Sequence, residues 1–276
     1  MFKFDSCKVL VTCCNLMGGL YEIYFDEQDY HIKKILEGDC RGIAKYSDNY
    51  VLVTNSSEIL LLDFNYQTIK SYKTEEILDL HGVAVRDEKA YVVETRRNAV
   101  GVYRLPDLVK IEELRISQED YDVNHVNDIC IDQENIYVSM FSSSGEWRKN
   151  SIYSGLVKEY SLLDLSYVNT VFCDLKHPHS VIKEGENILY CNSADFEVME
   201  NKNTIFRGLG YTRGLAANNE FIYIGQSESR NIEVSRQNRL NISLDCGINV
   251  FNIREKVSRF ITLPSKEVYA ILVNHA

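Results

Sequence analysis

Short runs of alternating apolar and polar residues recur along the whole chain, and no stretch carries a long apolar stripe of helical period. The runs are rich in β-branched and aromatic residues, which favour strands. Gly, Asn, Asp and Ser separate them, because the chain has only three prolines for its turns. The pattern therefore predicts an all-β protein built from successive hairpins.

Within this pattern, one polar residue followed by a short apolar strand recurs six times. The segments are Arg41-Gly-Ile-Ala, His81-Gly-Val-Ala-Val, Asn127-Asp-Ile-Cys-Ile, His179-Ser-Val-Ile, Arg213-Gly-Leu-Ala and, more weakly, Glu267-Val-Tyr-Ala-Ile. A hairpin partner follows each of the first five. Such a repeat is typical of a β-propeller, whose first strands line a central channel.

The spacing of the motifs predicts six blades. Successive motifs are 40, 46, 52, 34 and 54 residues apart, and the interval across the joined termini is 50. Seven blades would need about 39 residues each, which most intervals exceed. Segment 267–273 has the pattern of a first strand, and segments 8–12, 19–25 and 31–35 supply the other three strands of its blade. We expect one six-bladed propeller over residues 1–276, closed by the C-terminal strand joining the N-terminal strands, which covers both sheet edges.

Composition and charge narrow the functional classes. Hydrophobic content of 45% and charged content of 25% are ordinary for a globular protein. No apolar run is long enough to span a membrane, and the N-terminus lacks the pattern of a secretory signal. A net charge of −10 argues against a nucleic-acid partner. The eight cysteines include no CxxC pair, so we expect reduced thiols in a cytoplasmic protein without a membrane partner.

The propeller brings the six motif residues to one face. In a blade the first strand leaves one face and the second strand returns to it, so the start of one and the end of the other lie together. The predicted ring of Arg41, His81, Asn127, His179, Arg213 and Glu267 thus shares a face with Asn192 and Gln226. Two long loops, 142–150 and 226–245, fall between second and third strands on this side. Function often lies where loops meet on a rigid scaffold.

Histidines are concentrated at this face. Four of the six, His81, His125, His177 and His179, lie there. Imidazoles from different blades could share a divalent ion such as zinc or manganese, with His81 and His179 as first candidates. The alternative is that each ring binds a nearby backbone group. Asp128 and Glu267 could instead hold calcium, although the ring has few carboxylates for that ion.

Arg41 and Arg213 form the second chemical signal. A guanidinium at a channel mouth suits a carboxylate or a phosphate. The alternative is a salt bridge to Glu267 or Asp128 across the channel, and the sequence leaves both open. Trp147, in a polar loop, is expected to be exposed and able to stack on a ligand.

Several stretches resemble an uncharacterised bacterial family of propeller-like proteins, known as a conserved hypothetical family or domain of unknown function. They are His125-Val-Asn-Asp-Ile, Gly145-Glu-Trp-Arg, Pro178-His-Ser, Cys191-Asn-Ser, Tyr211-Thr-Arg-Gly-Leu-Ala, Gly225-Gln-Ser-Glu-Ser-Arg and Cys246-Gly-Ile-Asn-Val. The resemblance implies the propeller fold, but no reaction. The residues to which it gives importance are His125, Asn127, Asp128, His179, Asn192, Arg213, Gln226 and Ser227. More distantly, the architecture looks like the gluconolactonase and strictosidine-synthase propellers, whose calcium site of acidic and amide residues is partly matched.

The sequence therefore favours an enzyme, a lyase, hydrolase or isomerase, acting on a small anionic or polyhydroxylated molecule in the central pocket. His81 and His179 would serve as metal ligands or as general acid and base. Arg41 and Arg213 would hold the anion, while Asn127 and Asp128 would orient the substrate. The alternative is a binding module that takes a small ligand, a peptide or a protein on the same face. A protein partner would dock on loop 226–245, which carries Arg230, Arg236 and Arg239.

Overall fold

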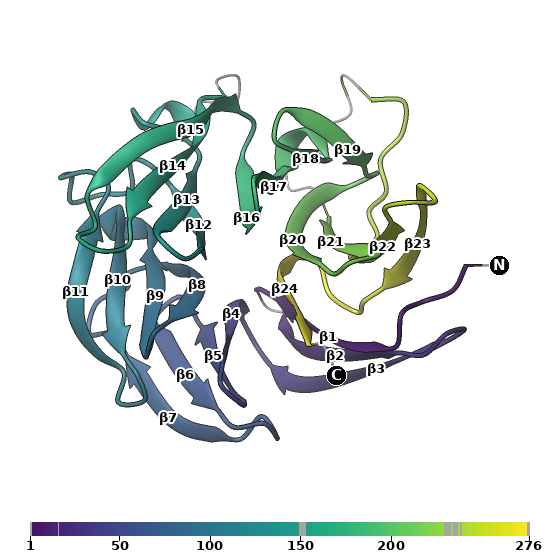
Figure 1. Ribbon diagram of the computed structural model, residues 1–276, viewed down its shortest axis with the longest axis horizontal. Coiled ribbons are helices and arrows are strands. Elements are labelled where there is room, and N and C mark those ends of the chain that lie inside the picture. The colour runs from purple at the N-terminus through teal and green to yellow at the C-terminus, as the bar shows by residue number, and fades with distance from the viewer. Residues whose placement is uncertain are drawn as a thin grey trace.

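The computed structural model describes residues 2–15, 17–148, 153–228, 233, 237 and 239–274. Six four-stranded antiparallel sheets stand around a central axis as the blades of a propeller (Figure 1). The fold, the blade number and the hairpin order predicted from the sequence are confirmed.

In each blade the innermost strand comes first in the following lists. Blade 1 is β24 (Val268–Asn274), β1 (Cys7–Cys13), β2 (Gly19–Phe25) and β3 (Tyr30–Glu37). Blade 2 is β4 (Cys40–Tyr46), β5 (Asn49–Thr54), β6 (Glu58–Leu62) and β7 (Thr68–Lys73). Blade 3 is β8 (Leu80–Arg86), β9 (Lys89–Glu94), β10 (Ala99–Arg104) and β11 (Val109–Arg115).

The second half of the ring has the same order. Blade 4 is β12 (Val126–Ile131), β13 (Asn135–Met140), β14 (Gly155–Ser161) and β15 (Tyr167–Leu175). Blade 5 is β16 (Pro178–Glu184), β17 (Asn187–Asn192), β18 (Glu197–Glu200) and β19 (Asn203–Arg207). Blade 6 is β20 (Tyr211–Ala217), β21 (Phe221–Ser227), β22 (Gly247–Asn252) and β23 (Val257–Thr262). Three short 3-10 helices, η1 (Thr95–Arg97), η2 (Glu146–Arg148) and η3 (Ser193–Asp195), interrupt the connections.

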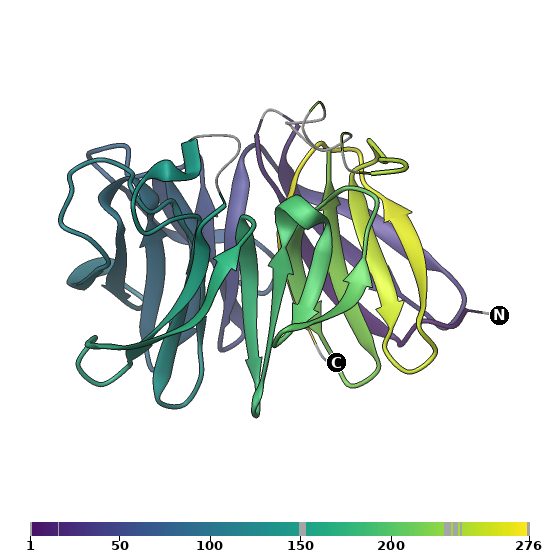
Figure 2. The same ribbon diagram turned by 90° about the horizontal axis from the view of Figure 1, so that it is seen from above.

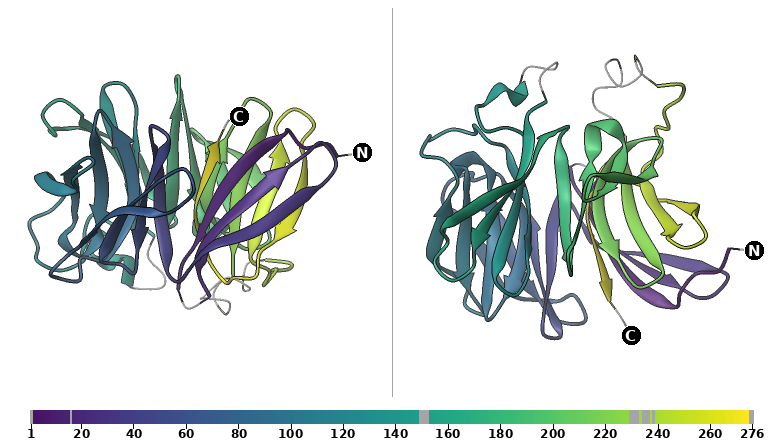
Figure 3. Two further views of the ribbon diagram at one scale, coloured as in Figure 1. Left: turned by 90° about the horizontal axis from the view of Figure 1, so that it is seen from below. Right: turned by 45° about the horizontal axis from the view of Figure 1, so that its top comes forward.

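The ring closes in blade 1, as predicted. The C-terminal strand β24 pairs antiparallel with β1 from Lys8 opposite Asn274 to Cys13 opposite Val268. The two segments lie side by side although they come from opposite ends of the chain (Figure 3). This pairing covers the inner edge of β1 and joins the C-terminal strand to the first blade.

Burial is greatest in the second strands of the blades, such as β5 and β9, whereas outermost strands such as β7 are largely exposed. Large rings fill the wedges between the blades. Tyr21, Tyr103, Tyr190 and Tyr223 are among the largest fully buried side chains. The tyrosines therefore act first as packing groups.

The connections between second and third strands gather on one side of the propeller, which we call the loop face (Figure 2). η1, η2 and η3 lie there, together with the described parts of loops 142–150 and 226–245. Arg230 and Arg236 lie outside the described residues. Arg239 binds within the protein: it stacks 3.9 Å from the centre of the Phe196 ring and donates to the carbonyl of Ala194 at 2.6 Å.

All eight cysteines are unpaired, and six of them are buried. Within the described part of the chain, no helix has the length and apolar character needed to cross a membrane.

Candidate functional site

A β-bulge interrupts the innermost strand of every blade near its loop-face end. In β4 the pairing with β5 shifts between Cys40 and Ile43, so that Arg41 and Gly42 face a single residue of β5. Such bulges bend a strand and redirect a side chain. The equivalent bulge residues around the ring are Arg41, His81, Asn127, Ser180, Arg213 and Tyr269.

The bulges correct the alignment made from the sequence. His179 and Glu267 were expected in the ring, but the structure puts Ser180 and Tyr269 at the equivalent positions. For Tyr269 the signal was present in the sequence: the small Ala270 follows it, as Gly42 follows Arg41. Tyr269 departs from the pattern of a polar residue ahead of an apolar strand, because most of its side chain is apolar.

The glycines of the motif are required by the neighbouring blade. A Cβ on Gly42 would lie 2.6 Å from the carbonyl oxygen of His81, and one on Gly82 would lie 2.4 Å from Oδ1 of Asp128. The innermost strands therefore approach each other too closely for any side chain at these positions. The Arg-Gly and His-Gly pairs of the sequence combine a bulge residue with this close contact.

The bulge residues touch one another across the blades. Nη1 of Arg41 lies 3.2 Å from Nδ1 of His81, and the rings of His81 and Tyr269 are 5.7 Å apart. The Tyr269 hydroxyl donates to the carbonyl of Asn127 at 3.3 Å, and Cζ of Arg213 lies 3.8 Å from the centre of the Tyr269 ring. These contacts place the ring residues together at the loop-face end of the channel.

Arg213 is the ring residue with unused hydrogen-bonding capacity. Its Nε is buried and has no hydrogen-bond partner among the described residues. Burial disfavours its charge, but Tyr269, Cys14 and Glu267 outweigh this and keep the pKa of Arg213 above its usual value. A buried, charged donor without a partner is costly, and a bound anion would remove that cost.

Arg41, in contrast, is already neutralised. Its Nη1 donates to Oδ1 of Asp79 at 2.7 Å and to the carbonyl of Leu80 at 2.9 Å, and its Nε faces Asp39 at 3.3 Å. The salt bridge expected to Glu267 or Asp128 is thus made to Asp39 and Asp79. Arg41 is placed to hold His81 rather than to receive a ligand.

His81 and His179 are buried and neutral. Their exposed fractions are 6% and 3%. The pKa of each lies well below its usual value because burial disfavours the cation, and nearby guanidinium and imidazole groups add to this. Nδ1 of His81 lies 2.8 Å from the carbonyl of Asp79, and Nδ1 of His179 lies 3.1 Å from that of His177. These carbonyls can only accept, which favours a proton on Nδ1 and leaves Nε2 as the accepting nitrogen. Nδ1 of each ring has a second neighbour, the donor Nη1 of Arg41 at 3.2 Å for His81 and the hydroxyl of Ser193 at 2.8 Å for His179.

His125 belongs to a wall of contacting rings. Its ring lies 4.4 Å from that of Trp147 and 4.6 Å from that of Phe141, and His177 stacks on Phe141 at 4.2 Å. Arg148 covers Trp147, with its Cζ 4.2 Å from the ring centre. Trp147 was expected to be exposed, but the residue is partly buried, and its Nε1 is buried without a partner among the described residues.

The wall is anchored by Asp122. This carboxylate accepts from the backbone N–H of His125 at 2.7 Å and lies 2.9 Å from its Nδ1. Arg148 reaches the same carboxylate at 3.3 Å. Sequence reasoning missed Asp122 and Phe141, since neither belongs to a repeated motif.

Asp128 brings an acid next to the ring. Burial disfavours its anion and raises its pKa to about 6, although the N–H of Ile129, at 2.9 Å, and the charge of Arg213 oppose the rise. A carboxyl group with this pKa can gain or lose a proton near neutral pH.

Four further predicted site residues bind other groups of the protein. Asn127 bonds the hydroxyl of Ser139 at 2.7 Å, and Gln226 donates to the carbonyl of Asp245 at 3.1 Å. Asn192 accepts from the N–H of Lys176 at 2.7 Å. Glu267 accepts from the thiol of Cys14 at 3.4 Å. These contacts position loops and strand ends around the channel.

The predicted metal site would rest on two imidazoles, those of His81 and His179. In the residues described, no group of three or more His, Cys, Asp or Glu side chains could hold a metal ion. The ion at His81 and His179 remains a prediction.

Taken together, the fold and the site define a six-bladed β-propeller with a ring of cationic, imidazole and aromatic side chains at one end of its channel. Residues 30–274 match the family described as a domain of unknown function, DUF4915, and the chain belongs to this family. The resemblance read from the sequence motifs is thereby confirmed.

Solved structures share the fold at low sequence identity. A chain of the nidogen/laminin complex superposes with a TM-score of 0.71 at 10% identity, covering 96% of this chain and 97% of that chain. A protein of unknown function from Bacteroides caccae gives 0.68 at 12% identity, with 97% and 99% covered. A streptogramin B lyase gives 0.51 at 11% identity, with 82% and 69% covered. No curated protein sequence matches significantly.

Proposed function

We propose that this propeller is an enzyme acting on a small anionic molecule bound at the loop-face end of its channel. The observation that carries the proposal is Arg213, whose buried Nε has no partner among the described residues while its side chain stacks on Tyr269. A carboxylate or phosphate would accept a hydrogen bond from this Nε–H group. Its hydration water would be replaced by a charge-assisted hydrogen bond, which is strong in a buried site.

The imidazoles supply the proton transfer. With the proton on Nδ1, as the carbonyls of Asp79 and His177 favour, each of His81 and His179 offers the lone pair of Nε2 to an acidic proton of the substrate. Burial, and after it nearby guanidinium and imidazole groups, hold both pKa values down. A bound anion would favour the protonated form of each ring, which strengthens the ring as a base. Lyase, hydrolase and isomerase chemistry all require such a step.

Trp147 makes binding directly measurable. It is the single tryptophan of the chain and lies 4.4 Å from His125, so its fluorescence reports on this site. Small carboxylates and phosphates are titrated against uncharged alcohols of similar size. We expect the anions to change the emission, and Arg213→Lys to weaken binding about tenfold because a point charge cannot replace the fork of donors. Arg254→Lys, an exposed arginine at the other end of blade 6, is the matched control.

Activity is then sought on the molecules that bind. Product formation followed by NMR should fall by about 10²–10⁴-fold in His179→Gln if that ring transfers a proton. His31→Gln, on the exposed strand β3, should keep the wild-type rate. Uncharged analogues that bind as tightly as the anions would contradict the proposal.

A second candidate is a non-catalytic binding propeller. The low pKa values of His81 and His179 favour it, since such rings are weak bases in the free protein. This candidate predicts anion binding that depends on Arg213 but no turnover of any bound molecule. The predicted divalent ion, whose ligands would be Nε2 of His81 and His179, is tested by elemental analysis of the wild type against His179→Gln.

A further inference from the structure

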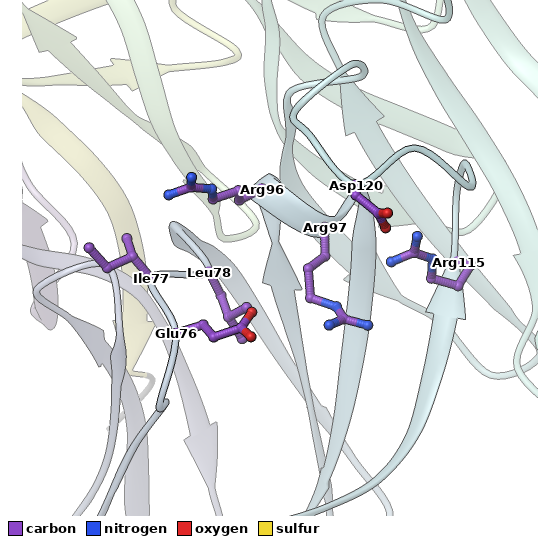
Figure 4. Close-up of a pocket in the computed structure, with 7 residues that line it drawn as sticks. All are labelled: Glu76, Ile77, Leu78, Arg96, Arg97, Arg115 and Asp120. Atoms are coloured by element: carbon purple, nitrogen blue, oxygen red, sulfur yellow. The ribbon is translucent and has the colours of Figure 1, made fainter.

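A separate cavity of about 600 Å³ opens on the loop face between blades 2 and 3. It lies between the connection from β7 to β8, the η1 turn and the segment after β11. Its lining combines three guanidinium groups, two carboxylates and two aliphatic side chains (Figure 4): Arg96, Arg97, Arg115, Glu76, Asp120, Ile77 and Leu78. The volume is within the range of small-molecule sites.

The opposite charges of this lining do not neutralise one another. Among the described residues, Arg97 pairs with Glu94 at 3.9 Å and with Glu113 at 3.4 Å, and not with the carboxylates of the cavity. Arg115 likewise pairs with Glu113, at 3.7 Å. Arg96, Glu76 and Asp120 form no ion pair within the described chain. Figure 4 shows Arg96 extending to one side of the cavity and Arg97 to the other. The cavity thus presents separated positive and negative groups.

The backbone around the cavity is rigid. The N–H of Arg96 donates to the carbonyl of Leu78 at 3.0 Å, and the N–H of Thr95 donates to that of Asp79 at 3.3 Å. Thr95, the first residue of η1, and Asn98, the residue after η1, are fully buried. The charged groups therefore project from a fixed frame, which lowers the entropy lost when a ligand binds.

Apolar surface completes the lining. Ile77 is 65% exposed, although it is a large aliphatic residue, and Leu78 beside it is half-buried. Covering such surface favours a ligand that has an aliphatic side chain as well as charge.

We propose that this cavity binds a zwitterion of the amino-acid or short-peptide type. The ligand carboxylate pairs with the guanidinium groups, its ammonium group pairs with Glu76 or Asp120, and its aliphatic side chain covers Ile77. The site is distinct from the central ring and does not depend on the function proposed for that ring.

Calorimetric titration with leucine and with leucyl-leucine tests the proposal, because either probe carries both charges and an aliphatic group. N-acetyl-leucine lacks the ammonium group and leucinamide lacks the carboxylate. We expect saturable binding of at least one zwitterion. N-acetyl-leucine and leucinamide should each bind about tenfold or more weakly than that zwitterion. The comparison of leucine with the dipeptide distinguishes an amino-acid site from a peptide site.

Variants assign the charges to residues. Arg96→Ala and Asp120→Asn should each weaken the zwitterion about tenfold, and neither removes an ion pair of the folded protein. Arg254→Ala is the matched control and should leave binding unchanged. N-acetyl-leucine bound as tightly as leucine would overturn the zwitterion assignment. The proposed site would be overturned if the wild-type protein bound neither leucine nor leucyl-leucine. It would also be overturned if all three variants bound the zwitterion equally well.

Discussion

The guanidinium of Arg213 lies over the ring of Tyr269, with Cζ 3.8 Å from the ring centre, and the two residues occupy the bulges of adjacent blades 6 and 1. The ring face carries partial negative charge, so it supports the cation without taking up its Nε donor. This arrangement keeps Arg213 charged in a buried place while its Nε stays available to a ligand.

The stacking of Tyr269 can be separated from its hydroxyl by two substitutions. Tyr269→Phe removes the hydrogen bond to the Asn127 carbonyl and should cost about 1 kcal/mol of unfolding free energy without changing anion affinity. Tyr269→Leu also removes the platform under Arg213 and should weaken anion binding about tenfold. Urea unfolding and Trp147 fluorescence titration measure the two effects. Equal anion affinity in the two variants would show that the platform is unimportant.

Stability should decrease as the pH falls through the range in which free histidine titrates. His179 is neutral in the folded protein and its pKa lies well below 6.5, whereas in the unfolded chain it takes up a proton below about 6.5. Protonation then favours the unfolded state, by about 1.4 kcal/mol per buried histidine at one pH unit below 6.5.

Between pH 7.5 and 5.5, the free energy of unfolding of His179→Gln should therefore fall by about 1.4 kcal/mol less than that of the wild type, as measured by urea unfolding. The raised pKa of Asp128 acts in the opposite direction, because the folded state gains a proton as the pH falls through about 6. Asp128 is present in both proteins, so its contribution is common to the comparison. His31→Gln, on an exposed strand, should follow the wild type. An equal loss in His179→Gln and the wild type would contradict burial of a neutral ring.

Adding one methyl group to Gly82 should destabilise the propeller. The new Cβ would lie 2.4 Å from Oδ1 and 2.9 Å from Cα of Asp128, so backbone of two blades must separate. We expect Gly82→Ala to cost about 3 kcal/mol. Gly208→Ala is the control: its nearest atom would be 3.4 Å away, and its cost should stay within about 0.5 kcal/mol. A thermal melt of both variants decides whether the blades can move apart at low cost.

Asn98 holds the segment that leads into the wall of contacting rings around His125. Its buried amide makes four hydrogen bonds, accepting from the N–H groups of Val123 and Asn124 and donating to the carbonyls of Glu119 and Tyr121. It also has a φ of 50°, a conformation that asparagine tolerates better than most residues. Asn98→Ala should cost about 3 kcal/mol or more, because buried backbone groups lose their partners.

The same variant should shift the emission of Trp147, since Asp122 lies within the segment that Asn98 binds and His125 follows it directly. Asn201→Ala, at a less buried turn with a similar φ of 55°, should cost about 1 kcal/mol and leave the emission unchanged. Unaltered fluorescence in Asn98→Ala would mean that the wall is held from elsewhere.

Much of the fold could be predicted from local pattern. Hairpins such as β4–β5 are adjacent in sequence, and apolar alternation with turn residues marks them directly. The closure by β24 could be predicted from the number of strands in each repeat. The C-terminal end of the chain has one strand with the pattern of a first strand, and the N-terminal end has three strands that lack a first strand, so together they make one blade.

The site could be predicted only in outline. Arg41 and Arg213 occur in the same motif, yet Asp39 and Asp79 neutralise the first, while Nε of the second has no partner within the described chain. Asp79 comes from the connection to another blade, and no local pattern shows that it reaches Arg41.

The amino-acid sequence by itself determined the class, the blade number, the closure and the face on which the chemistry gathers, because these depend on repeated local patterns and on their spacing. Tertiary structure decided which side chains meet there. A shift of one or two residues at each bulge put Ser180 and Tyr269 in the ring instead of His179 and Glu267. Bulge positions depend on how neighbouring blades pack, and that packing becomes visible only when all six stand around one axis.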